Sequence, residues 1–203
     1  MSEVFIIDAI RTPIGSFLGQ YKKTESVDLG SLCVEGIFSR NKNLNKKHVE
    51  GLILGQVLTA GLGMNTARQV LLKSKLSQNS FAYCVNQVCG SGMRAVMETA
   101  LKIKSNENQL LVAGGQESMS LARHTSLQRV TTKLGHEMMI DSILSEGLTD
   151  VFSKDHMGIT AENVARRYKV TRLEQDEFAF HSYKKAYNAL KKNYFKNELI
   201  SSP

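Results

Sequence analysis

Short apolar runs alternate with segments of helical periodicity over the first 115 residues, and this alternation most constrains the fold. The apolar runs are 4–7, 51–58, 81–85 and 109–115, and the helical segments between them are 27–40, 66–76 and 91–104. Strands that alternate with helices along a chain usually form a sheet with the helices packed on its faces. We therefore predict an α/β fold in which a mixed or parallel sheet is covered by helices.

The periodicity also predicts which helical faces are buried. In the segment 91–104 the apolar positions recur at helical spacing and are Met93, Val96, Met97, Ala100 and Leu101. In the segment 27–40 the corresponding residues are Leu29, Leu32, Cys33, Gly36 and Ile37. We expect both sets to face the core.

The pattern changes after about Glu117. The stretch that follows has no clean period and is expected to be a long excursion from the core. Two helices come next, 160–169 with Thr160 as its cap, and 171–192, which opens with the capping box Thr171-x-x-Glu174. The chain then ends in residues that read like the start of another strand. We place an α/β domain at residues 1–118 and a mostly helical loop domain at residues 119–203.

Composition narrows the class of function. No apolar run reaches the roughly 18 residues of a membrane span, and the N-terminus lacks the basic region of a signal peptide. The 3 cysteines, an odd number, do not suggest a disulfide framework. We therefore expect a reducing compartment, the cytoplasm, and no membrane partner.

The net charge of +7 has two interpretations. It is either a solvated surface or an attraction for a polyanionic ligand such as a coenzyme phosphate. No zinc-finger spacing or RNA-binding signature accompanies the charge, so we expect no nucleic-acid partner.

Cys89 is the candidate nucleophile, because it lies between an apolar run and the start of a helix. Unpaired N–H groups and the helix dipole favour a thiolate there, and the thiolate is the nucleophilic form of cysteine. Gly90 and Gly92 allow a sharp turn and leave room for a substrate. Ser91 can cap the helix.

The alternative for Cys89 is a small buried residue at a turn. We assign Cys33, on a helix face, and Cys84, within a strand, to the core. Cys84 and Cys89 do not have the spacing of metal ligands, so we expect no metal site.

The segment "NQVCGSGMRAV" (86–96) resembles the nucleophile segment of thiolases. Further segments resemble that family in the same order, at 8–19, 55–70, 112–120 and 155–186. The resemblance spans essentially the whole chain, and the "HMG" at 156–158 is similar to the biosynthetic branch, the acetyl-CoA acetyltransferases. Met64 and Thr66 depart from the Gln and Pro usual in the family.

The resemblance implies a thiolase-like N-terminal half that carries out acyl transfer. Cys89 would attack acetyl-CoA and become acetylated, and a second acetyl-CoA would then condense with it to give acetoacetyl-CoA, with thiolysis as the reverse reaction. Leu148, His156 and Met157 would lie in the loop domain that binds coenzyme A. For His156 and Met157 the alternatives are a structural hydrogen-bonding histidine and a core-filling residue. Coenzyme A thioesters would be substrates, and no other cofactor is implied.

The resemblance also implies that part of the machinery lies elsewhere. Thiolases are about twice this long, and their second half supplies a histidine, a second cysteine and an Asn-containing oxyanion site. Here no cysteine follows Cys89 and the last histidine is His181. We expect a chain that lacks the C-terminal half and the last strand of its sheet, exposes an apolar face, and is inactive alone.

Other outcomes remain open. The chain could belong to a degradative 3-ketoacyl-CoA thiolase, or be a non-catalytic remnant or interaction fragment. A ketosynthase-type condensing enzyme is disfavoured by its different cysteine segment. By resemblance, a homodimer would form along 81–85, and a homotetramer through the excursion at about 123–141.

Overall fold

The centre of the molecule is a three-stranded parallel sheet in the order β2-β1-β3. The structure is a computed structural model, and it describes residues 3–130 and 134–200. The strands are β1 (Gly51–Gly55), β2 (Phe81–Val85) and β3 (Leu111–Gly115). The first residues of the three strands are in register, so Gly51 lies opposite both Phe81 and Leu111. The predicted α/β class is confirmed.

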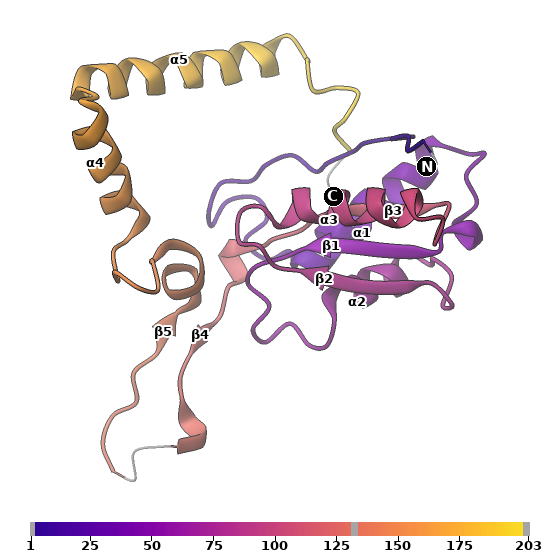
Figure 1. Ribbon diagram of the computed structural model, residues 1–203, viewed down its shortest axis with the longest axis horizontal. Helices are drawn as coiled ribbons and strands as arrows, with labels where there is room; N and C mark the ends of the chain where they lie inside the picture. The colour runs from indigo at the N-terminus through magenta and orange to yellow at the C-terminus, as the bar shows by residue number, and fades with distance from the viewer. Residues whose placement is uncertain (1–2, 131–133, 201–203) are drawn as a thin grey trace.

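Helices cover both faces of this sheet (Figure 1). They are α1 (Ser26–Arg40), α2 (Thr66–Lys73) and α3 (Ser91–Lys104). The chain moves from β1 outward to β2 through α2, and then back past β1 to β3 through α3. Right-handed crossovers in opposite directions place the two connecting helices on opposite faces. Helix α1 packs beside α2.

The main core lies between the sheet and the pair α1 and α2. Its buried members are Val27, Val34, Phe38, Val49, Leu52, Leu54, Ala67, Val70, Leu71 and Leu76. Because side chains alternate along a strand, Leu52 and Leu54 face this core while Ile53, also fully buried, faces the other side.

The predicted inner face of α1 is wrong by a rotation of the helix. The residues buried there are Ser26, Val27, Gly30, Ser31, Val34 and Phe38, whereas the predicted residues Leu29, Leu32, Cys33, Gly36 and Ile37 are half-buried. Gly30 accounts for part of the rotation: a Cβ there would lie 2.1 Å from the Gln116 Oε1 atom, so α1 approaches the sheet closely at this glycine.

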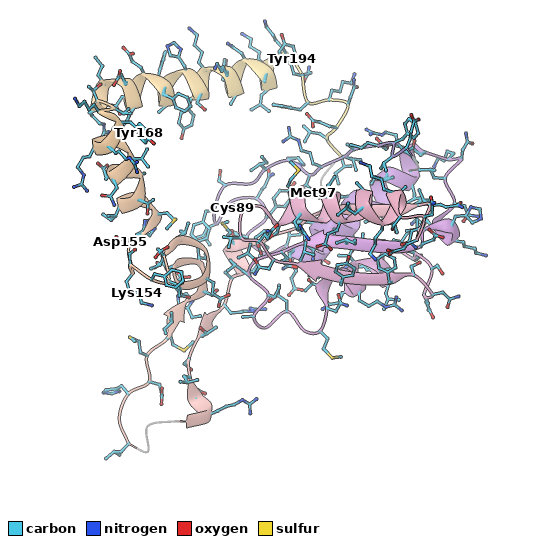
Figure 2. All side chains as sticks on the ribbon, in the orientation of Figure 1. Cys89, Met97, Lys154, Asp155, Tyr168 and Tyr194 are labelled. Carbon is cyan, nitrogen blue, oxygen red and sulfur yellow. The ribbon has the colours of Figure 1, made fainter. Side chains whose placement is uncertain are left out.

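Helix α3 has the predicted bounds, but the opposite face lies on the sheet. The buried residues are Ser91, Ala95 and Thr99. The predicted inner residues Met93, Val96, Met97 and Leu101 are 40–67% exposed. The physical reason is close packing, because a row of small residues lets the helix backbone approach the strands, and the larger apolar side chains then point outward. Figure 2 shows Met97 on the outer side of α3.

The predicted strand at residues 4–7 is wrong. Among the described residues the segment forms no strand ladder, and Phe5, Ile6 and Ile7 are 61–80% exposed. An apolar run becomes a strand only where an edge pairs with it. The N-terminal segment pairs instead through an isolated bridge between Arg11 and Leu199.

The excursion after Glu117 contains more structure than the sequence predicts. It has a two-stranded antiparallel ladder, β4 (His124–Thr125) with β5 (Ile140–Asp141), followed by one wide helical turn, η4 (Ile143–Leu148). Short 3₁₀ turns occur at η2 (Met119–Leu121) and η3 (Gln128–Val130), and earlier in the chain at η1 (Lys46–His48). The strand predicted to begin near the chain end is represented by Leu199 and Ile200, and residues 201–203 lie outside the described residues.

The last two helices, α4 (Met157–Tyr168) and α5 (Arg172–Lys191), stand apart from the sheet: α4 leads away from the excursion, and α5 runs back toward the core (Figure 1). Neither has a buried residue. The capping box of Thr171 and Glu174 is confirmed. The predicted cap Thr160 is wrong, because α4 begins earlier and His156 caps it.

Candidate active site

Cys89 lies in a tight loop, residues 86–90, between the end of β2 and the start of α3. Its thiol is free and exposed. In open α/β sheets, ligands bind outside the carboxyl ends of the parallel strands, and this loop leaves the sheet at that end. In the view of Figure 2, Cys89 lies at the end of the core that faces the excursion.

Two glycines set the height of α3 above the sheet. A Cβ on Gly55 would lie 2.4 Å from the Ser91 carbonyl carbon and 2.5 Å from the Gly92 nitrogen, which real Cβ atoms do not tolerate. A Cβ on Gly115 would lie 3.4 Å from the Gly92 Cα atom. The first turn of α3 therefore sits directly on the ends of β1 and β3.

Ser91 does not cap α3 as predicted. The N-cap residue is Gly90, and no side chain caps the helix. The Ser91 hydroxyl turns back into the loop instead, where it accepts from the Gln87 amide (2.8 Å) and donates to the Val88 carbonyl (2.6 Å).

The strained residue of the loop is Val88, which the sequence does not single out. Its φ is +50°, a conformation that β-branched residues avoid. Gly90, which was expected to supply the sharp turn, has an ordinary φ of −84°. The turn is thus made by a non-glycine residue held in place by its neighbours.

The predicted coenzyme A residues are brought together within the excursion. Thr149, which follows Leu148, forms an antiparallel bridge with His156, and Met157 is the next residue. The His156 Nδ1 atom accepts from the Gly158 amide (2.9 Å) and so starts α4. In the described part of the chain, no hydrogen bond or ion pair joins these residues to Cys89, and their role in binding coenzyme A stays a prediction.

A buried polar cluster that sequence reasoning missed lies at the carboxyl end of β1. The Gln56 Oε1 atom accepts from Thr66 Oγ1 (2.5 Å) and from Gln116 Nε2 (2.9 Å), and Gln56 Nε2 donates to Ser26 Oγ (2.9 Å). Thr66 is buried, whereas Met64, the other departure from the family motif, is 91% exposed. The cluster ties α1, α2 and the ends of two strands together.

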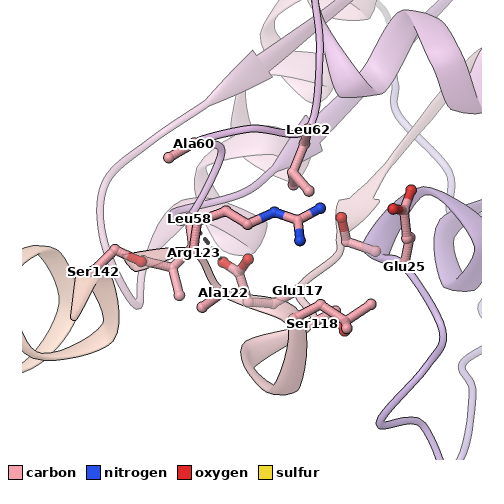
Figure 3. A pocket seen from close by; sticks show the side chains of 11 residues that line it. Glu25, Leu58, Ala60, Leu62, Glu117, Ser118, Ala122, Arg123 and Ser142 are labelled. Carbon is pink, nitrogen blue, oxygen red and sulfur yellow. Dashed lines mark hydrogen bonds between the residues drawn. The ribbon is translucent and has the colours of Figure 1, made fainter. Parts of the chain in front are cut away.

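Glu117 joins the loop after β1 to the loop after β3. Its Oε2 atom accepts from the Val57 and Leu58 amides, at 2.9 Å and 3.3 Å. Burial raises the pKa of Glu117 above its usual value, although these amide donors oppose the shift. A small cavity beside this carboxylate is lined by Glu25, Arg123 and Ser142 among others, at the base of the excursion (Figure 3).

Cys33 and Cys84 are half-buried and free. Burial raises the pKa of the Cys33 thiol, and the Cys84 sulfur lies 3.1 Å from the Thr66 hydroxyl. Among residues 3–130 and 134–200, no group of three His, Cys, Asp or Glu side chains could hold a metal ion. None of the helices in those ranges is long and apolar enough to cross a membrane.

Residues 4–202 match the family model of the thiolase N-terminal domain. The chain belongs to the thiolase family. The predicted resemblance is thereby confirmed over essentially its whole length.

Other members of the family are similar to the chain in sequence and in structure. The chain is 42% identical to an acetyl-CoA acetyltransferase of Paracoccus denitrificans and 43% identical to one of Escherichia coli, over 98% of its own length in both cases. A crystal structure of the thiolase Acat5 from Ascaris suum in complex with coenzyme A superimposes with a TM-score of 0.89 and 34% identity over 94% of the chain. The chain spans about half the length of these relatives: 51% of each of the two acetyltransferases and 50% of the Acat5 chain.

Proposed function

We propose that this chain is the nucleophile-bearing half of an acetyl-CoA C-acetyltransferase, with Cys89 as the acyl acceptor. The observation that carries the proposal is the exposed Cys89 thiol in a fixed loop at the carboxyl end of the sheet. The names of the relatives supply the substrate class, coenzyme A thioesters.

The proposed chemistry has two steps. The Cys89 thiolate attacks the carbonyl carbon of acetyl-CoA, the bond from that carbon to the coenzyme A sulfur breaks, and coenzyme A leaves as a thiolate. A base then removes an α-proton from a second acetyl-CoA, and the resulting carbanion attacks the acetyl-cysteine. The new carbon–carbon bond gives acetoacetyl-CoA, and Cys89 departs as the thiolate. Thiolysis reverses the sequence.

By the same resemblance, proton transfer and stabilisation of the developing oxyanion would use groups outside these 203 residues. By family resemblance those groups are a histidine, a second cysteine and an asparagine-bearing site. Residues that act as a unit lose most of the rate when one is missing. We therefore propose that the 203-residue chain alone has negligible activity.

The first test separates acyl transfer from turnover. The purified chain is incubated with acetyl-CoA, and its cysteine peptides are examined by mass spectrometry for one added acetyl group. We expect slow acetylation at Cys89 and none at Cys33 or Cys84. Cleavage of acetoacetyl-CoA by this chain at normal enzyme rates would contradict the proposed division of the machinery.

The second test adds the second half of a relative. Residues 1–203 are joined to the second half of the similar Escherichia coli acetyl-CoA acetyltransferase. We expect thiolase activity that Cys89→Ala abolishes. A well-folded but inactive chimera would favour the non-catalytic interaction fragment, and a preference for long 3-ketoacyl-CoA substrates would favour the degradative thiolase.

Several further assignments belong to the same proposal. Leu148, His156 and Met157 would contact coenzyme A, and residues 1–118 and 119–203 would form the two domains. Self-association would use the free edge of β2 for a homodimer and the β4–β5 excursion for a homotetramer. Sedimentation of the chimera, with and without residues 123–141, tests both contacts.

A further inference from the structure

Val88 adopts its left-handed conformation although only about half of the residue is buried. The side chain is 46% exposed, although the residue has φ +50°. Strained residues persist where the surrounding structure holds them, and they concentrate at functional sites. The neighbouring contacts must therefore supply what holds Val88 in place.

Side chains from both ends of the loop bind the backbone of Val88. The Asn86 Oδ1 atom accepts from the Val88 amide (2.9 Å), and the Ser91 hydroxyl donates to the Val88 carbonyl (2.6 Å). The same hydroxyl accepts from the Gln87 amide (2.8 Å). Ser91 is 4% exposed, so water does not readily replace it.

The conformation of Val88 sets the direction in which Cys89 leaves the backbone. The two residues are adjacent, and a change of Val88 from positive to negative φ would turn the following peptide and the Cys89 side chain with it. Gly90 and Ser91 are anchored on the far side, by bonds from the Gly90 amide to the Gln87 carbonyl (3.0 Å) and from the Ser91 amide to the Val88 carbonyl (3.1 Å). Cys89 therefore lies between the start of α3, which hydrogen bonds hold in place, and the strained residue Val88.

We propose that Ser91 and Asn86 are positioning residues that hold Val88 in its left-handed conformation and so aim the Cys89 thiol. The inference rests on the proposed role of Cys89 as the nucleophile. It adds that the hydroxyl of Ser91 acts through the backbone of Val88 and not as a helix cap.

The test is a double-mutant cycle on the 203-residue chain, with iodoacetamide as the probe. The rate of Cys89 alkylation is measured by peptide mass spectrometry, with Cys84 as the internal reference. We expect Ser91→Ala to lower the Cys89 rate by about fivefold or more, the population change that corresponds to the usual strain of a left-handed residue. Ser91→Thr, which keeps the hydroxyl, should restore it.

The decisive comparison is made in a Val88→Gly background. Glycine adopts positive φ without strain, so removal of the Ser91 hydroxyl should there cost little. Equal effects of Ser91→Ala with valine and with glycine at position 88, or an unchanged rate in Ser91→Ala, would overturn the proposal. Ser105→Ala, which removes a comparable hydroxyl bond (3.0 Å to the Lys102 carbonyl) at the other end of α3, is the matched control and should leave the rate unchanged.

Asn86 provides a second route if Ser91→Ala does not fold. Asn86 is exposed, and Asn86→Ala should lower the alkylation rate while Asn86→Ser, whose hydroxyl can accept from the Val88 amide without adding a charge, should lower it less. Equal rates of Cys89 alkylation in the two Asn86 variants would count against the proposal. Alkylation needs no acetyl-CoA. If the alkylation rates follow the expected pattern but acetyl-CoA does not acetylate Cys89, the proposed function is refuted and the positioning role stands.

Discussion

At the scale of single residues, buried polar side chains hold together segments that are far apart in the sequence. Thr66 stands where the family usually has proline, and its hydroxyl supplies one of the two donors to the Gln56 Oε1 atom. A buried group that loses a hydrogen-bond partner is costly, because water cannot take the partner's place. The threonine that departs from the family motif is therefore part of the buried hydrogen-bond network of this chain.

We predict that Thr66→Val lowers the free energy of unfolding by about 1–2 kcal/mol, whereas Thr66→Ser lowers it less. Valine keeps the volume but removes the donor to Gln56, and serine keeps the donor. Urea unfolding followed by circular dichroism measures both variants. A larger loss for serine than for valine would mean that the methyl group, and not the hydroxyl, matters at this position.

Glu117 gives a prediction about pH. Since burial raises its pKa in the folded chain, the proton is held more tightly in the folded state than in the unfolded state. The stability that it contributes is therefore full below the unfolded pKa of about 4.3 and is lost as the pH rises through the folded pKa.

Glu117→Gln removes this titration while leaving an oxygen to accept from the Val57 amide. We expect the stability of the glutamine variant relative to the parent chain to increase as the pH rises above the unfolded pKa of about 4.3. Urea unfolding at several pH values gives the difference. A stability difference that does not change with pH would show that the Glu117 carboxyl group has the same pKa in the folded and unfolded states.

At the scale of elements, α3 is defined by how closely it approaches the sheet. We predict that Gly55→Ala lowers the free energy of unfolding by about 1–3 kcal/mol or more, because the added methyl would meet the backbone of Ser91 and Gly92. Gly114→Ala, whose methyl would lie 3.8 Å from the Leu54 side chain, is the matched control and should be tolerated. Chemical denaturation of the two variants decides, and similar losses would contradict the packing described here.

The same helix shows what can be predicted from sequence and what cannot. The limits of α3, the alternation of strands and helices and the position of Cys89 follow from local patterns of apolar residues and glycines. The face of α3 that is buried does not, because periodicity marks the larger apolar residues while the sheet selects the smaller ones. The strand expected at residues 4–7 fails for a related reason, since a strand depends on a partner edge that the segment itself does not encode.

The loop around Cys89 marks the same limit at the candidate site. A serine at the start of a helix is usually its cap, and nothing in the local sequence distinguishes that role from a bond into the preceding loop. The strain at Val88 was equally invisible, because valine is an unexpected choice for positive φ. The position of the nucleophile was predictable, but the means by which it is held was not.

At the scale of the whole molecule, large apolar side chains remain uncovered. On α3 these side chains form the outer face of the helix. On α4 and α5 no residue is buried, so their apolar side chains are uncovered as well. Contiguous apolar patches of this kind usually belong to an interface. We expect the rest of a full-length thiolase to cover the α3 face, in keeping with the half-length match to the relatives.

We predict that Leu101→Glu reduces the self-association of the 203-residue chain. The charge would stand in the exposed apolar face of α3, where Leu101 is 59% exposed. Light scattering over a range of protein concentrations measures the effect. Leu72→Glu, at a 46% exposed position on α2, is the control and should change association less; equal effects would assign the association to net charge and not to the α3 face.

The central place of β1 has a consequence for how the chain is made. β1 is synthesised before both of its neighbours, yet it is buried along its whole length in the finished sheet. Once β2 has emerged from the ribosome, the other edge of β1 stays open until residues 111–115 arrive. At ordinary rates of translation that delay is on the order of a few seconds. During it, the open edge of β1 can pair with the same edge of another nascent chain, which is a route to aggregation.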